Sequence, residues 1–88
     1  MDKKTIRCIR RAFGYTRGEL AELLGVYSST VSRWETGVYK VTRPMQQRVK
    51  ETLKLTEEDL EHVQLLIMQQ DILAQRFSQK SVNRKGVN

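Results

Sequence analysis

The sequence has few of the residues that build disulfides, metal sites and active sites. It contains one cysteine, Cys8, and one histidine, His62, and no cysteine and histidine cluster with metal-ligand spacing. A single cysteine cannot form a disulfide within the chain, which is typical of a protein from a reducing cytoplasm. One histidine, one cysteine and no carboxylates clustered in a cleft supply no acid–base pair or activated nucleophile. We therefore expect no enzyme activity, no metal and no cofactor.

Long apolar runs are missing as well. No stretch approaches the roughly 18 apolar residues that a membrane-spanning helix needs. The first residues, Met-Asp-Lys-Lys-Thr, lack the apolar segment and cleavage site of a secretory signal. The 88 residues are enough for one domain and too few for a second independent core. We expect a single cytoplasmic domain with no membrane partner.

Acidic residues are scarce in the first half of the chain. Sixteen Lys and Arg against ten Asp and Glu give a net charge of +6. Residues 1–43 hold nine basic and four acidic side chains, residues 44–77 hold four and six, and residues 78–88 hold three and none. A basic charge alone is compatible with nucleic acid, an anionic membrane or mere solubility. The concentration of basic residues in the first half of the chain and in the tail favours nucleic acid as the partner.

Glycine, proline and capping residues divide the chain into segments that predict five helices and no strand. The expected class is therefore all-α, a compact five-helix bundle. Gly14, Gly25 and Gly37 are stop signals, and Pro44 suits the first turn of a helix. Thr16 and Thr56 each precede an acidic residue by three positions and open capping boxes. The expected helices cover about residues 4–13, 16–25, 28–36, 44–53 and 56–79.

Residues 17–37, RGELAELLGVYSSTVSRWETG, contain the most informative pattern. Two helices that cross steeply need a small residue at their contact and a glycine in the turn, which Ala21 and Gly25 supply. The apolar residues expected to meet inside the corner are Leu20, Leu24, Val26, Val31 and Trp34. This stretch resembles the helix-turn-helix of the lambdoid phage repressor and Cro family, also called XRE-like. The resemblance covers about residues 6–55.

The resemblance implies a DNA-binding fold of the phage-repressor type in the bacterial cytoplasm, with double-stranded DNA as partner. It implies a structural ion pair between Arg10 in the first helix and Glu35 near the end of the third. It places phosphate contacts at the start of the second helix and around the end of the third, at Arg17, Thr36, Lys40 and Arg43. It places base contacts on the exposed residues of the third helix, namely Ser28, Ser29, Ser32 and Arg33.

The residue pattern of the segment 28–36 independently supports base contacts by its exposed residues. Val31 and Trp34 are expected to turn inward, which leaves the three serines and Arg33 on the outward face. Short serine side chains let the helix lie deep in a major groove about 12 Å wide, and Arg33 can donate to both O6 and N7 of guanine. A serine hydroxyl can form a hydrogen bond with almost any base. We therefore expect one guanine contact, from Arg33, and the serines predict little else about the DNA sequence that is recognised.

Tyr27 departs from the family pattern, which has Ser or Thr here as the cap of the third helix. A tyrosine side chain cannot cap locally, although its hydroxyl can reach a phosphate. Ser28 is the alternative cap. In that case the helix starts one residue later and Ser28 is a weaker base reader.

Several other residues are expected to have ordinary roles. Arg7 and Arg11 are interpreted as solvated charges, and Cys8 as a partly buried apolar residue. Trp34 is interpreted as a core residue rather than a platform for base stacking. None of these four is expected to contact DNA bases.

The predicted helix 56–79 carries two apolar stripes. The first, expected to cover the core, comprises Leu60, Val63, Leu66, Ile67, Leu73, Ala74 and Phe77. The second comprises Leu65, Met68 and Ile72, and a homodimer is its expected use, with simple exposure as the alternative. Two-fold symmetry would place the recognition helices about 34 Å apart, on a palindromic operator.

These features predict a homodimeric transcriptional regulator, usually a repressor, from a phage or other mobile element. Residues 1–55 would form the DNA-binding core, 56–80 the dimerisation helix and 81–88 a basic flexible tail. The alternative is a protein-binding module, such as an antitoxin or antirepressor, that uses helix 56–80. Possible protein partners are a toxin, an antirepressor or RNA polymerase.

Overall fold

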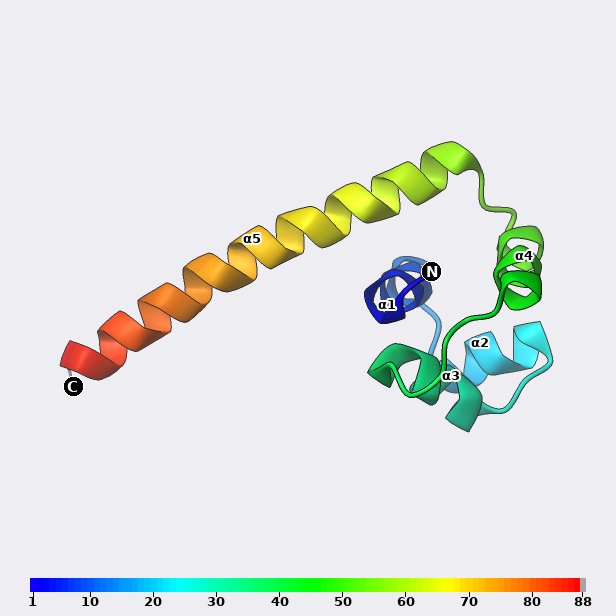
Figure 1. Ribbon diagram of the computed structural model, residues 1–88, viewed down its shortest axis with the longest axis horizontal. Coiled ribbons are helices and arrows are strands. Elements are labelled where there is room, and N and C mark those ends of the chain that lie inside the picture. The colour runs from blue at the N-terminus through cyan, green and yellow to red at the C-terminus, as the bar shows by residue number, and fades with distance from the viewer. Residues whose placement is uncertain (88) are drawn as a thin grey trace.

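Five α-helices, and no strand, make up the part of the chain that the computed structural model describes, which is residues 1–87, with side chains to residue 77. The all-α class and the number of helices predicted from the sequence are therefore confirmed. Figure 1 shows the first four helices gathered into one body, which the fifth helix crosses before it extends far beyond it. The helices are α1 (Lys3–Ala12), α2 (Arg17–Leu24), α3 (Ser28–Thr36), α4 (Arg43–Leu53) and α5 (Glu57–Val87).

The two predicted capping boxes open α2 and α5. Thr16 N donates to Oε1 of Glu19 at 2.8 Å, and Glu19 N donates to Oγ1 of Thr16 at 3.1 Å. Thr56 and Asp59 repeat the arrangement at 2.9 and 3.1 Å. Each box satisfies two backbone amides that the helix itself leaves without an acceptor. The sequence signal for both helix starts was therefore sufficient.

Left-handed residues end the helices on either side of the predicted turn. Gly25 ends α2 at a φ of 71° and Gly37 ends α3 at a φ of 82°. This backbone conformation is cheap for glycine and costly for residues with a Cβ. It redirects the chain sharply after each helix, so that α3 packs across α2 and against α1.

The core lies where α1, α2 and α3 meet. Leu20, Leu24 and Val31 hold the corner between α2 and α3 and are almost completely buried. Trp34 is 5% exposed, so it is a core residue as the sequence predicted. The remaining buried apolar residues are Ile6, Ile9, Ala21, Val41, Val49, Leu53 and Val63.

Only the first part of α5 covers this core. Leu60, Val63 and Ile67 pack against it, and Lys4 Nζ on α1 contacts Asp71 Oδ1 at 3.1 Å. The other large residues of the first predicted stripe remain exposed, so the sequence prediction was wrong for Leu66, Leu73 and Phe77. For Leu73 and Phe77 the reason is length: α1 has 10 residues and α5 has 31, and a 10-residue helix spans only about 15 Å. Leu66 lies beside α1 but lines an open hollow between the two helices.

The helix α5 also continues past the predicted end near Gln79, and its backbone is helical to Val87. An established helix propagates readily, and the lysines and the arginine that follow Gln79 are good helix formers. Part of the expected flexible tail 81–88 is therefore helical, and Asn88 lies outside the described residues. The division of roles among 1–55, 56–80 and 81–88 remains a prediction. In the described chain, no helix combines the length and apolar character needed to cross a membrane.

Candidate nucleic-acid interface

The helix α3 has one buried face and one exposed face. Val31, Trp34 and Glu35 are buried against the body. The opposite face presents small polar side chains and one arginine, with Ser32 half-buried and Ser28, Ser29, Arg33 and Thr36 exposed. The structure thus brings together, on one face, the four residues predicted to contact bases and one residue predicted to contact phosphate.

The start of α3 resolves the two alternatives for Tyr27 and Ser28. Tyr27 is the N-cap residue, with extended backbone and no hydrogen bond from its side chain to the helix. Its carbonyl accepts from Thr30 N at 2.9 Å, which places Ser28 inside the first turn. The alternative in which Ser28 caps a helix that starts later is therefore wrong. Tyr27 is 82% exposed at the start of the exposed face of α3.

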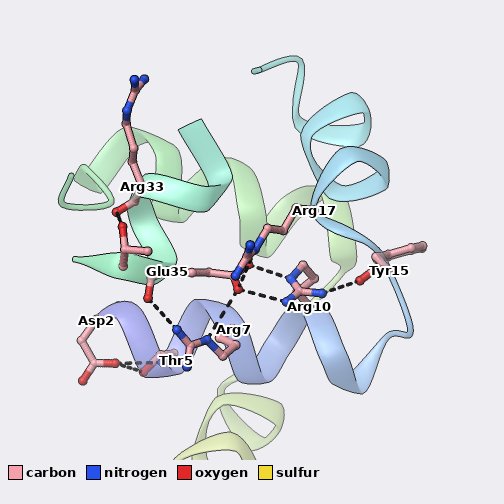
Figure 2. Close-up of polar contacts among 9 residues, drawn as sticks. Asp2, Thr5, Arg7, Arg10, Tyr15, Arg17, Arg33 and Glu35 are labelled. Atoms are coloured by element: carbon pink, nitrogen blue, oxygen red, sulfur yellow. Dashed lines mark hydrogen bonds and ion pairs between the residues drawn. The ribbon is translucent and has the colours of Figure 1, made fainter. Parts of the chain in front are cut away.

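Arg33 is held by the turn that follows α3. Its guanidinium carbon lies 5.3 Å from the ring centroid of Tyr39, within the range of a cation–π contact. Tyr39 N also donates to the carbonyl of Arg33 at 3.2 Å. Figure 2 shows Arg33 pointing away from the cluster of charged residues around Glu35. Arg33 takes part in none of the ion pairs found among the described side chains.

The sequence reasoning missed Tyr39. The sequence signal for Tyr39 was only the presence of an aromatic residue shortly after Gly37. Its contact with Arg33 depends on how far the chain turns at that glycine. Lys40, a predicted phosphate contact, lines the same surface hollows as Tyr39 and Trp34. Arg43, another predicted contact, is exposed at the first position of α4. The segment after α3 therefore presents two further cations to solvent.

Glu35, on the buried face of α3, is fully buried and bound by Arg10. Arg10 Nε donates to Oε2 of Glu35 at 2.6 Å, and Nη2 donates to Oε1 at 3.0 Å. Arg10 also donates to the carbonyl of Tyr15 at 2.9 Å. Burial raises the pKa of Glu35, but hydrogen bonds and charge from Arg10 and Arg17 outweigh it and hold that pKa below its ordinary value. The pair implied by the resemblance is thus a charged link between α1 and α3.

Two further arginines converge on Glu35 (Figure 2). Arg7 Nη2 donates to the backbone carbonyl of Glu35 at 2.9 Å, and Arg17 Nε lies 3.4 Å from its Oε1. The prediction that Arg7 is a solvated charge is wrong, because α1 crosses the end of α3 and Arg7 satisfies a terminal carbonyl there. The Arg17 side chain is still 45% exposed despite this contact.

The residues predicted to form a dimer interface lie on α5. Leu65, Met68 and Ile72 are 54%, 60% and 54% exposed. They lie on the side of α5 away from Leu60 and Val63, which pack on the body. The structure therefore places these three together on one outward face and separates them from α3.

The described side chains offer no grouping of three or more His, Cys, Asp or Glu that could hold a metal ion. His62 is exposed on α5. Cys8 is half-buried, and burial raises the pKa of its thiol, which makes it less reactive.

Comparison with known proteins identifies the family of the chain. A family model described as a helix-turn-helix domain matches residues 4–63, a span from α1 into the first turns of α5. Neither the curated proteins nor the solved structures contain a match to the chain. The matched span ends at Val63, the last buried core residue. It includes all of α3 and the turn that carries Tyr39, and it leaves out most of the exposed part of α5.

Proposed function

Because the chain belongs to the helix-turn-helix domain family, we propose that it is a sequence-specific transcriptional regulator of the XRE-like, phage-repressor type. It acts in the bacterial cytoplasm by inserting α3 into the major groove of double-stranded DNA. The single observation that carries this proposal is the two-faced character of α3. Its core-forming residues are buried, and its serines and Arg33 remain accessible.

Base recognition rests on Arg33, with Ser28, Ser29 and Ser32 beside it. An arginine can donate two hydrogen bonds to guanine, which distinguishes that base from the other three. The contact with Tyr39 restricts the Arg33 side chain before DNA arrives, so less rotamer freedom is lost on binding. The short serines allow close approach of the helix to the base edges.

Phosphate contacts position α3 in the groove. We assign them to Arg17, Tyr27, Thr36, Lys40 and Arg43, all of which are exposed. Arg17 has a second role, because its Nε is already engaged by Glu35. This contact fixes the Arg17 side chain close to α3, where a phosphate at the edge of the groove would lie.

The regulator acts as a homodimer on a palindromic operator and represses by occlusion of RNA polymerase. The exposed residues Leu65, Met68 and Ile72 on α5 support the dimer, because they form an apolar face that the body does not cover. Two-fold symmetry of the protein would be matched by two-fold symmetry of the operator.

The same exposed face supports a second candidate function. An antitoxin or antirepressor would use α5 to bind a different protein, and its DNA contacts would be secondary. Under this alternative, substitutions at Met68 and Ile72 abolish the main activity, and substitutions at Arg33 do not. A toxin, an antirepressor or RNA polymerase would be the partner.

Selection of bound sequences from random duplex DNA tests the proposal. We expect the wild-type protein to enrich a palindrome with a guanine in each half-site. Arg33→Ala should lose the preference at that guanine, and the matched control Arg11→Ala, on the exposed surface of α1, should keep it. Enrichment of no sequence, or the same motif with Arg33→Ala, would contradict the proposed docking of α3.

A further inference from the structure

We propose that α5 pairs with α5 of a second copy of this chain in the antiparallel orientation. The contact surface is a charged and apolar stripe formed by Glu61, Leu65, Met68, Ile72 and Arg76. This inference rests on the dimer of the proposed function and adds the orientation of the two helices and the ion pairs that select it.

The five residues of the stripe share one face of α5. Their spacings are four, three, four and four residues, which keep side chains on one side of a helix with 3.6 residues per turn. All five are exposed. The body lies on a neighbouring side of α5, where Val63 and Ile67 pack on the core and Asp71 contacts Lys4, and it leaves the stripe uncovered.

The stripe is nearly symmetric about its middle. Leu65 and Ile72 lie at equal distances from the midpoint between Met68 and Gln69, and so do Glu61 and Arg76. In an antiparallel pair centred there, Leu65 faces Ile72 of the second copy and Met68 lies at the centre. The apolar residues then meet without a shift in register.

Charge selects this orientation over the parallel one. In the antiparallel pair, Glu61 of each copy faces Arg76 of the other, which gives two ion pairs of opposite charge. In a parallel pair, Glu61 faces Glu61 and Arg76 faces Arg76, and like charges that face each other are destabilising. The sequence extends the asymmetry, with acidic residues at Glu57, Glu58 and Asp59 and three basic residues but no acidic one in residues 78–88.

The pairing leaves the candidate DNA-binding surface free. The first residues of the two α5 helices would lie about 35 Å apart, from a rise of 1.5 Å per residue. The two bodies are therefore held toward opposite ends of the helix pair. The stripe lies on α5, which packs on α1, and the proposed base-contacting residues lie on the exposed face of α3.

Charge reversal tests the orientation by sedimentation equilibrium. Glu61→Arg converts both ion pairs of the antiparallel dimer to like-charge pairs, so we expect a dissociation constant about tenfold higher. Arg76→Glu should have a similar effect, and the double variant Glu61→Arg/Arg76→Glu should restore the wild-type constant. Glu51→Arg, the same charge change at an exposed site on α4, is the control and should leave it unchanged.

Cysteine cross-linking tests the register. In a Cys8→Ala background, copies with Leu65→Cys and differently tagged copies with Ile72→Cys should form a mixed disulfide on mild oxidation. Leu65→Cys alone should form little dimer. A parallel pair would give the reverse result, with efficient cross-linking of Leu65→Cys to itself, and would overturn the proposal.

A purely monomeric wild-type protein would also overturn the antiparallel pair, as would single charge reversals that change nothing. A monomer would also remove the homodimer from the proposed function, but none of these results bears on the proposed reading of DNA by α3, because selection from random DNA with Arg33→Ala as the comparison does not depend on α5. If Arg33→Ala binds as the wild type does and the charge swap still restores the dimer, the DNA-reading proposal fails and the antiparallel pair stands.

Discussion

The guanidinium carbon of Arg33 lies 5.3 Å from the ring centroid of Tyr39, and the amide of Tyr39 donates to the carbonyl of Arg33 at 3.2 Å. Arg33 and Tyr39 therefore contact each other through their side chains and also through a backbone hydrogen bond. The turn at Gly37, with its φ of 82°, brings the ring back to the end of α3. The proposed reading arginine is thus oriented by a residue outside the helix that carries it.

The Tyr39 ring should contribute to base discrimination. Tyr39→Leu removes the ring and retains an apolar side chain, so we expect a loss of about 0.5 to 1 kcal/mol in operator binding, mainly at the guanine that Arg33 reads. Tyr39→Phe retains the ring face and should bind as the wild type does. Titrations on the operator and on an operator lacking that guanine measure the effect. Equal losses for both variants would assign the role to the hydroxyl instead.

Arg33→Ala should weaken binding to the operator by about 1 to 3 kcal/mol and relax one base position in each half-site. The physical reason is the loss of two hydrogen bonds to guanine. Affinity for unrelated DNA should change much less. Fluorescence anisotropy with operator and random duplexes separates the two effects, and an equal loss on both would show that Arg33 contacts only the backbone.

Arg17→Ala should instead weaken binding to all duplexes alike. A lost phosphate contact lowers the slope of log affinity against log salt by about one unit. Thermal unfolding of the free protein provides the control, because Arg17 also contacts Glu35. Its side chain is 45% exposed, so a small change in stability is expected. An unchanged salt slope would remove Arg17 from the phosphate contacts.

Glu35→Ala should destabilise the free protein by about 3 kcal/mol. Glu35 is fully buried and the Arg10 side chain is only 12% exposed, so the substitution leaves a largely buried guanidinium without its counter-charge. Arg7 and Arg17 are more exposed and can be solvated again, which limits the loss. Urea denaturation measures it. The exposed Glu51→Ala should change stability by no more than about 0.5 kcal/mol, and a similarly small effect of Glu35→Ala would contradict the structural role.

Stability should fall on acidification below about pH 5. Burial raises the pKa of Glu35, but Arg10 and Arg17 lower it further, so the net direction is below the ordinary value of 4.5. A hydrogen bond from the Thr5 amide likewise lowers the pKa of Asp2 from 3.8. The unfolded chain therefore takes up protons first as the pH falls, which favours unfolding. Melting temperatures followed by circular dichroism should be nearly constant above about pH 5 and fall below it.

A Glu35→Gln variant checks the origin of that pH dependence. Its melting temperature should depend less steeply on pH in the acidic range, because the buried titrating group is gone. A wild-type protein that becomes more stable as the pH falls, or a variant as pH-sensitive as the wild type, would contradict the assignment.

Local signals in the sequence were sufficient for the helices and the corner, whereas contacts between distant segments were not. Thr16 and Gly25 act through atoms of their own turns, so their roles can be read from neighbouring residues. The role of Arg7 depends on the angle at which α1 crosses α3, and that of Tyr39 on the path of the chain after Gly37. The exposure of Phe77 depends on the small length of α1, which periodicity within α5 cannot reveal.

On α3, the residues that stabilise the fold and the residues proposed to contact bases are different, so the second set can vary without affecting the first. Stability is supplied by Val31, Trp34 and Glu35, and the exposed serines contribute little to the packing of the body. Surface substitutions away from packed or charged contacts usually cost less than about 0.5 kcal/mol. Ser28 and Ser29 can therefore be replaced by larger polar residues with little effect on folding. A new operator preference can thus arise by single substitutions in a protein that remains folded at every step.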